Sequence, residues 1–148
     1  MEKDIVLELR TNIHQLTRLF GLNEQTKTPC GFALSISQVI ALQELNNQQL
    51  SGTNLAEKLR LERSSVSRLI DSLVKGGFVL RKENEHNRRE TLLSLTEKGE
   101  RTVTEVSESS VQFFRTILIN MTEQEQKQLI YSLRKFTSSL LKVMGESK

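Results

Sequence analysis

The stretch Ser64-Ser-Val-Ser-Arg-Leu-Ile-Asp-Ser-Leu-Val-Lys75 decides the fold of this chain of 148 residues. Its apolar residues recur three and four positions apart and predict a helix with one buried stripe: Val66, Leu69, Ile70 and Leu73. The opposite face is polar and carries Ser64, Arg68, Asp71 and Lys75. Short hydroxyls near a helix start allow close approach to a groove wall, and an arginine fork matches guanine O6 and N7. Taken alone, this polar face fits an ordinary solvated helix surface better. Together with the hairpin that follows it, the stretch predicts a helix that reads DNA, with Arg68 reaching a base edge.

A shorter helix is predicted over residues 53–61, just before this stretch. Counted from Gly52, five apolar residues fall where two helices interlock at a steep angle: Leu55, Leu59, Leu61, Val66 and Leu69. Ala56 is the small residue expected where the two helices approach most closely. Arg60 stands in the turn, where glycine is common, so we expect a longer turn. The two helices together predict a helix-turn-helix.

A β-hairpin is predicted after the second helix, which Gly76-Gly77 ends, because glycine tolerates the left-handed conformation of a helix C-terminus. Two runs with β propensity follow, over residues 78–82 and 91–95, and a polar, basic loop separates them. Arg88 and Arg89 lie at the tip of that loop. The negative potential of a DNA minor groove attracts arginine, so the hairpin is predicted to be the wing of a winged helix-turn-helix.

Several motifs in this chain resemble those of the MarR family of bacterial transcriptional regulators. They are the run from Leu61 through Arg81, then Asn87-Arg-Arg89, then Leu93-Ser-Leu-Thr-Glu-Lys-Gly99, the most specific block. Leu34-Ser-Ile-Ser-Gln38 and Met121-Thr-Glu-Gln-Glu125, each opening a helix, extend the resemblance over nearly all of the chain. The resemblance implies a homodimeric winged-helix repressor or activator that a small molecule or oxidation controls.

The wing departs from the family pattern at one position. Arg89 matches the family's wing-tip arginine, but Asn87 stands where the family usually has aspartate. The resemblance therefore implies a weaker brace in the wing and a more mobile loop. We expect contacts with DNA from eleven residues: Thr53, Arg63, Ser64, Ser65, Ser67, Arg68, Lys75, Arg81, His86, Arg88 and Arg89.

The fold class predicted is mainly α with a small β-hairpin wing, an α+β winged helix-turn-helix over residues 35–98. Dimerisation helices are expected to flank it, at residues 1–22 and 100–148, in a single chain of 1–148. Helices are predicted at residues 4–20, 35–46, 96–120 and from 122 onward, with Ser35/Gln38 and Thr122/Glu125 as capping pairs and Gly99 as a weak point.

The terminal helices carry apolar seams that one small domain cannot bury. The seam residues are Ile5, Leu9, Ile13 and Leu16 in the first helix and Leu129, Leu133, Phe136 and Leu140 in the last. Large apolar side chains left in water cost about 25 cal/mol per Å2. We therefore expect a twofold homodimer on a palindromic operator, with a monomeric helical bundle as the alternative.

Charge and composition agree with this hypothesis. Residues 50–90 hold nine Lys or Arg against six Asp or Glu, which accounts for the whole net charge of +3, because the two flanking segments cancel. No apolar targeting region follows Met1, and no apolar run approaches the roughly 18 residues of a membrane span, so we expect a cytoplasmic protein without membrane contact. A single cysteine excludes an intramolecular disulfide.

Neither catalysis nor metal binding is indicated, and no cofactor is expected. His14 is predicted to be a partly buried helix residue, and His86 lies at the wing tip, where it can meet phosphate. Cys30 is the only candidate for redox sensing, although its expected role is that of a small apolar residue. The effector would be a small apolar or phenolic molecule. The alternative function is a winged-helix adaptor or anti-regulator that has lost DNA binding, which shows no salt-dependent affinity for duplex DNA.

Overall fold

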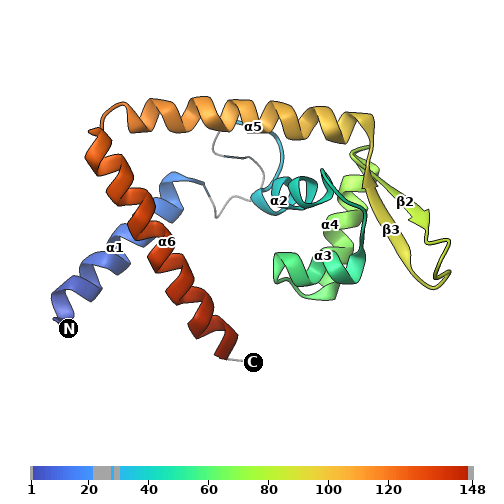
Figure 1. The fold of residues 1–148 in the computed structure, drawn as a ribbon, viewed down its shortest axis with the longest axis horizontal. Helices are drawn as coiled ribbons and strands as arrows, with labels where there is room; N and C mark the ends of the chain where they lie inside the picture. The colour runs from blue at the N-terminus through green and yellow to red at the C-terminus, as the bar shows by residue number, and fades with distance from the viewer. Residues whose placement is uncertain (1, 22–27, 29–30, 147–148) are drawn as a thin grey trace. The chain divides into compact units, whose positions relative to one another are not determined.

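The computed structural model describes residues 2–21, 28 and 31–146, and within them it contains helices α1–α6 and strands β1–β3 (Figure 1). The chain divides into two compact units, residues 1–110 and residues 111–148, and α5 contributes to both. The bounds are α1 Lys3–Leu19, α2 Ile36–Leu45, β1 Leu50–Ser51, α3 Gly52–Leu59, α4 Arg63–Lys75, β2 Val79–Glu83, β3 Thr91–Leu95, α5 Glu97–Leu118 and α6 Glu123–Glu146. The predicted α+β winged helix is confirmed.

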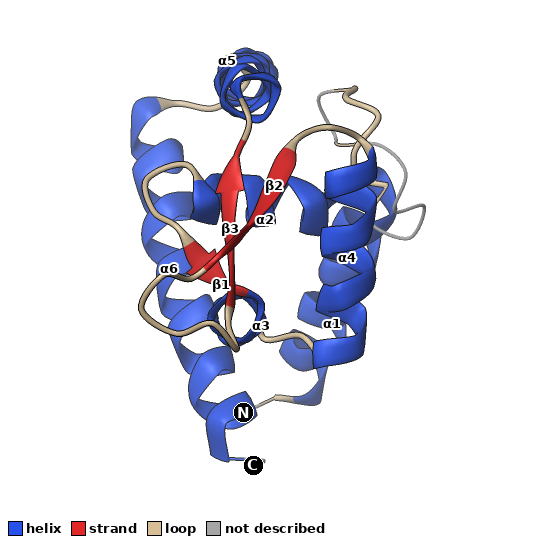
Figure 2. Ribbon diagram, turned by 90° about the vertical axis from the view of Figure 1, so that its right-hand side faces the viewer, coloured by secondary structure: helices blue, strands red, loops and turns tan. Residues whose placement is uncertain are grey.

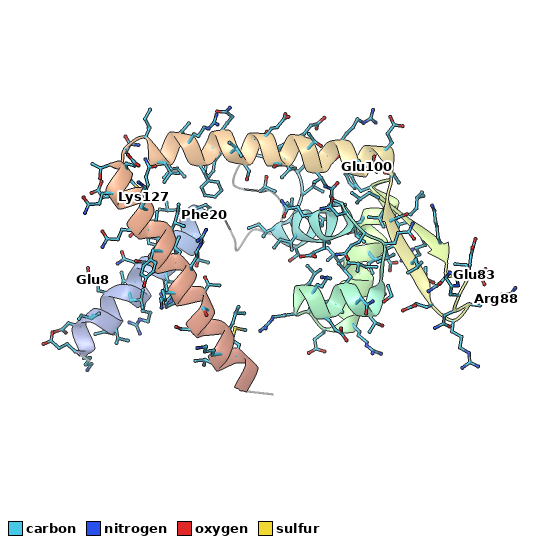
Figure 3. The ribbon with its side chains drawn as sticks, viewed as in Figure 1. Glu8, Phe20, Glu83, Arg88, Glu100 and Lys127 are labelled. Atoms are coloured by element: carbon cyan, nitrogen blue, oxygen red, sulfur yellow. The ribbon has the colours of Figure 1, made fainter. Side chains whose placement is uncertain are left out.

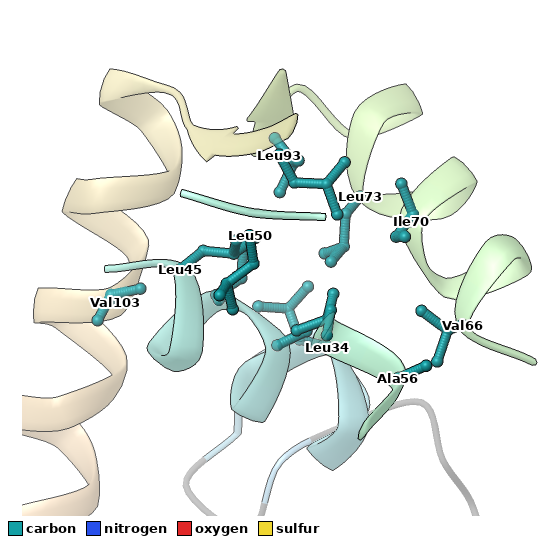
Figure 4. Close-up of a cluster of buried hydrophobic side chains, with 13 residues drawn as sticks. Leu34, Leu45, Leu50, Ala56, Val66, Ile70, Leu73, Leu93 and Val103 are labelled. Atoms are coloured by element: carbon teal, nitrogen blue, oxygen red, sulfur yellow. The ribbon is translucent and has the colours of Figure 1, made fainter. Parts of the chain in front are cut away.

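The core of the first unit lies between α2, α3, α4 and the sheet, and the first part of α5 adds Val103 (Figure 4). Leu42, Leu55 and Leu73 are fully buried, one from each of the three helices. Of the predicted stripe on α4, Val66, Ile70 and Leu73 are buried and Leu69 is partly buried. Burial of one side of α4 leaves its polar side exposed to solvent.

The turn between α3 and α4 has the ordinary length of three residues, so the expected longer turn is wrong. Arg60 adopts the left-handed conformation, with φ of 54°, that glycine usually supplies. The Leu61 amide donates to the Ala56 carbonyl at 3.2 Å, and the Arg60 amide donates to the Glu57 carbonyl at 3.2 Å. This hydrogen-bonding pattern ends α3 at Leu59, two residues before the predicted end.

Arg60→Gly should raise the free energy of unfolding by about 0.5–1 kcal/mol, because glycine adopts positive φ without the steric cost that a Cβ brings. Chemical denaturation followed by circular dichroism measures the change. Arg60→Ala is the matched control, since it removes the same guanidinium but keeps the Cβ. Equal stability of the two variants would show that the left-handed turn costs nothing here.

The sheet is antiparallel with the strand order β1-β3-β2 (Figure 2). In the hairpin, Val79 pairs with Leu95 and Glu83 pairs with Thr91, so β2 begins one residue later than predicted. The residue before it, Phe78, belongs to the turn that ends α4. Strand β1 was not predicted, because it has only two residues and pairs with β3, far along the chain.

Two predicted capping pairs are confirmed. The Ser35 hydroxyl accepts from the Gln38 amide at 3.1 Å, and the Gln38 side chain accepts from the Ser35 amide at 2.7 Å. Before α6, the Glu125 carboxylate accepts from the Thr122 amide at 2.7 Å and from its hydroxyl at 2.8 Å. These two hydrogen bonds favour the charged carboxylate and hold the pKa of Glu125 below its usual value.

The seams of α1 and α6 face solvent in the single chain. No residue of α1 is buried; Ile5, Leu9 and Leu16 are exposed, and Ile13 is half-buried. His14 is exposed, so its predicted partial burial is wrong; the helix is covered by too little of the chain to enclose it. On α6, Leu129, Leu133, Phe136 and Leu140 are all exposed. None of the described helices is long and apolar enough to cross a membrane.

Candidate nucleic-acid interface

The polar side of α4 is the centre of the candidate site. Ser64, Ser67, Arg68 and Lys75 are exposed, whereas Ser65 is half-buried. The backbone amides of the first turn of α4 have no side-chain cap. An uncapped helix start offers N–H groups and a partial positive charge to phosphate. Exposed serines and an arginine therefore stand beside a helix end that favours an anion.

A groove on the wing side of α4 brings together residues that are distant in sequence. Four of the predicted DNA contacts line it: Thr53 from α3, Arg63 and Ser67 from α4, and Arg81 from β2. Thr91 of β3 completes its polar lining, and Val66, Ile70 and Leu93 form its floor. The groove thus presents two arginines beside the start of α3, in the space between α4 and the wing.

A second groove lies on the other side of α4. It is lined by Ser65 and Arg68 of α4, together with the polar residues Ser35, Ser37, Gln38 and Ser72. The Gln38 side-chain amide donates to the Ser72 hydroxyl at 3.0 Å, which ties the start of α2 to α4. The predicted DNA contacts are therefore divided between two flanks of one helix, with Ser64 and Lys75 exposed outside both grooves.

Arg81 has a partner that sequence reasoning missed. Its guanidinium forms an ion pair with the Asp71 carboxylate of α4, ten residues earlier. Both side chains are partly exposed, 43% for Arg81 and 63% for Asp71, so the pair adds little to overall stability. It does link strand β2 of the wing directly to the polar side of α4. No clear signal of this pair was present in the sequence, because Arg68 and Lys75, three residues before and four after Asp71, are also possible partners on the same helix.

The wing loop is built from two consecutive turns that each begin with asparagine. The Asn87 amide donates to the Asn84 carbonyl at 3.1 Å, and the Glu90 amide donates to the Asn87 carbonyl at 2.9 Å. The side-chain oxygen of Asn84 accepts from the His86 amide at 3.0 Å. Asparagine favours this position because its side chain can bond the backbone two residues on. The loop is further closed by the Asn84 side-chain amide, which donates to the Glu90 carboxylate at 3.0 Å.

Asn87 holds the wing tip without a charge. Its side-chain oxygen accepts from the Arg89 amide at 3.2 Å, so it orders the backbone that carries the two arginines. Among the described residues, no ion pair includes Arg88 or Arg89. Both are exposed, as is His86, and Figure 3 shows Arg88 extending from the far end of the wing. In the part of the wing that the structure describes, hydrogen bonds and not an Asp–Arg ion pair therefore order the loop.

The described residues contain no cluster of three or more His, Cys, Asp or Glu that could hold a metal ion. Cys30, the predicted redox candidate, lies outside the described residues. The site is thus a charged and hydroxyl-bearing surface on a helix and a hairpin. Such a surface can form hydrogen bonds and ion pairs with a polyanion.

Comparisons with known proteins show what this chain is similar to. Residues 34–91 match the model of the MarR family. The HTH-type transcriptional regulator SarZ of Staphylococcus aureus (strain USA300) is 31% identical over 93 residues, which cover 63% of this chain and 62% of that protein. The matched segment therefore spans less than two thirds of the relative's length.

Two solved structures share the fold. The transcriptional regulator SlyA superposes with a TM-score of 0.71 at 21% identity, over 99% of this chain and 100% of that chain. The MepR–DNA complex of S. aureus gives 0.63 at 19% identity, over 94% and 98%. Structural similarity at this identity establishes the winged-helix fold. The part of this chain that matches the MarR family model, residues 34–91, is its helix-turn-helix together with most of its wing.

Proposed function

We propose that this protein is a transcriptional regulator that binds double-stranded DNA sequence-specifically as a homodimer and acts as a repressor. One observation carries the proposal: α4 exposes Ser64 and Arg68 on the unit whose wing exposes Arg88 and Arg89. A helix with short polar residues fits a major groove, and arginines at a hairpin tip fit the adjacent minor groove. SarZ is named a transcriptional regulator and MepR was solved with DNA, which supports the same function here.

The proposed dimer rests on the apolar seams of α1 and α6. In the single chain, Leu133 is 50% exposed and Phe136 is 41% exposed. A soluble protein rarely leaves so long a row of large apolar side chains in water, and a twofold partner is the commonest solution. Twofold symmetry would place two recognition helices about 34 Å apart, which matches a palindromic operator. The proposed place of action is the cytoplasm.

Control by an effector is part of the proposal. Helix α5 runs without interruption from the end of the wing strand β3 to the turn before α6. A small apolar or phenolic molecule that alters the direction of this helix would alter the separation of the two recognition helices. The expected result is a changed affinity for the operator when the effector is added, measured by fluorescence anisotropy at constant salt. Unchanged affinity across a panel of such molecules would contradict this part of the proposal.

Arg68→Ala should weaken binding to the selected operator by about 1–3 kcal/mol and relax the choice of base at one position. Arg89→Ala should weaken binding to all duplexes alike and reduce the slope of log K against log salt by about 0.9, because it removes one phosphate contact. Operators are first selected from random DNA with the wild-type protein, and both variants are then titrated at several salt concentrations.

Lys142→Ala, in α6, is the control for a loss of one positive charge far along the chain from the site. If Arg68→Ala and Lys142→Ala change operator affinity equally, Arg68 does not contact the DNA. If the wild-type protein selects no duplex and shows no salt-dependent binding, the adaptor function replaces the regulator. The feature that favours the adaptor function is the neutral Asn87 in the wing, at a position where the family usually has aspartate.

A further inference from the structure

The turn that ends the recognition helix is held from outside by the start of α5. Gly77 adopts a φ of 78°, the Phe78 amide donates to the Leu73 carbonyl at 2.9 Å, and the Gly77 amide donates to the Val74 carbonyl at 3.0 Å. These two hydrogen bonds complete a Schellman motif. The motif leaves the carbonyl groups of Gly76, Gly77 and Phe78 available to accept bonds from another element.

Each of these three carbonyls accepts a hydrogen bond from Thr96 or Lys98. The Thr96 amide donates to the Phe78 carbonyl at 3.0 Å, and the Thr96 hydroxyl donates to the Gly77 carbonyl at 2.6 Å. The same hydroxyl accepts from the Gly99 amide at 3.0 Å and so caps α5. Thr96 therefore begins α5 and fastens it to the end of α4 with the same side chain.

Lys98 makes the third contact and adds charge to it. Its ammonium donates to the Gly76 carbonyl at 2.7 Å and lies 4.4 Å from the centre of the Phe78 ring. The carbonyl end of a helix carries partial negative charge, and the face of an aromatic ring attracts a cation. The lysine is thus held by two interactions that a neutral side chain of equal length cannot make.

Gly99 allows the two backbones to meet. A Cβ at this position would lie 2.2 Å from the Phe78 carbonyl oxygen, so glycine has a packing role here that was not predicted. We name Thr96, Lys98 and Gly99, together with the turn of Gly76, Gly77 and Phe78, the α4–α5 latch. The backbone carbonyls of the turn after α4 accept all hydrogen bonds that Thr96 and Lys98 donate across the latch. The latch therefore depends on only two side chains as donors.

We infer that Lys98 is a positioning residue for DNA recognition, which holds α4 at a fixed angle to α5 without touching DNA itself. This inference rests on the proposed function. A recognition helix that is free to tilt must be ordered when DNA binds, and that ordering lowers affinity. Because the latch joins the end of α4 to the start of α5, it also couples the orientation of α4 to the orientation of α5.

The test compares Lys98→Met with Lys98→Arg and Arg101→Met. Methionine keeps the length of the side chain but removes the donor and the charge, whereas arginine restores both. Arg101 is exposed on the same helix and makes its ion pair with Glu97, away from the latch. Lys98→Met should weaken operator binding by about three- to tenfold, and Arg101→Met should leave it unchanged. Lys98→Arg should return the affinity to within about twofold of the wild type.

Two further measurements separate positioning from other roles. The slope of log K against log salt should stay unchanged in Lys98→Met; a decrease of about 0.9 would instead assign Lys98 to a phosphate contact and overturn the inference. Hydrogen exchange measured by NMR should show faster exchange at the amides of Thr96 and Gly99 in Lys98→Met, with no change in midpoint of global unfolding. Equal exchange and equal affinity in Lys98→Met and wild type would also overturn it.

The exchange experiment needs no DNA. If wild-type protein binds no duplex, the proposed function fails and the positioning role falls with it, while hydrogen exchange still reports whether Lys98 secures the turn. Thr96→Val provides a second variant of nearly equal size that removes the hydroxyl from Gly77. It should also weaken operator binding at an unchanged salt slope, and full retention of affinity would count against the latch.

Discussion

Leu133→Asp is expected to convert the protein from dimers to monomers at micromolar concentration. Leu133 is half-exposed in the middle of the α6 seam, next to Leu129 and Phe136 on the same side of the helix. A carboxylate buried without a partner in the proposed dimer interface costs roughly 3–5 kcal/mol. This cost lowers the association constant of the dimer by more than about a hundredfold. Sedimentation equilibrium over a range of concentrations measures the change.

Ser138→Asp is the matched control because it adds the same charge to the opposite side of α6, five residues or about 1.4 turns away. It should remain a dimer. Leu133→Asp should also bind a palindromic operator only as tightly as a single half-site. A dimeric Leu133→Asp would exclude the α6 seam as the interface, and a monomeric wild type would refute the dimer altogether.

Leu73→Ala is expected to lower the free energy of unfolding by about 2–5 kcal/mol. Leu73 is completely buried on the inner side of α4, where this helix packs against the core. Its truncation removes apolar contacts and leaves a cavity among side chains that cannot fully close around it. Urea denaturation at one fixed protein concentration measures the loss, because the proposed dimerisation would make apparent stability depend on concentration.

Leu80→Ala is the control for Leu73→Ala, since it removes the same atoms from a side chain that is 47% exposed on β2. Its expected cost is below about 1 kcal/mol. A loss of less than about 1 kcal/mol in Leu73→Ala would show that the core around α4 relaxes, and that this helix is held mainly by contacts at its ends.

Periodicity was enough to predict the elements that carry the site. Apolar residues at helical spacing located α4 and identified its buried side, because a helix of this length repeats the same pattern several times. Gly76-Gly77 located its end, and the capping pairs at Ser35 and Thr122 located two helix starts. These features depend on neighbours within a few residues, which a single sequence contains.

Short elements and single-residue turns were predicted less well. Strand β1 has two residues and forms only through pairing with β3, about forty positions later, so it has no pattern of its own. Arg60 adopts a conformation that glycine favours, because the hydrogen bonds at the end of α3 impose it. Strand β1 depends on a contact outside its local segment, whereas at Arg60 short-range hydrogen bonds to Ala56 and Glu57 outweigh the backbone preference of the residue.

The candidate site shows the same division. Arg88 and Arg89 were predicted at the wing tip, and the structure leaves both exposed there. The ion pair of Arg81 with Asp71 was not predicted, because only the return of β2 along α4 brings the two side chains together. The separation of Arg68 from Ser67 into different grooves likewise depends on what packs on each flank of α4.

The sequence by itself determined which stretches become helices and strands, which side of each is apolar, and where positive charge collects. Local spacing and capping are sufficient for these properties. Tertiary structure alone decided the bond from Lys98 to Gly76, 22 positions apart, and the bond from Gln38 to Ser72, 34 positions apart. Such contacts form only after the core has brought the helices together, because no short-range pattern specifies which distant carbonyl or hydroxyl groups will accept these hydrogen bonds.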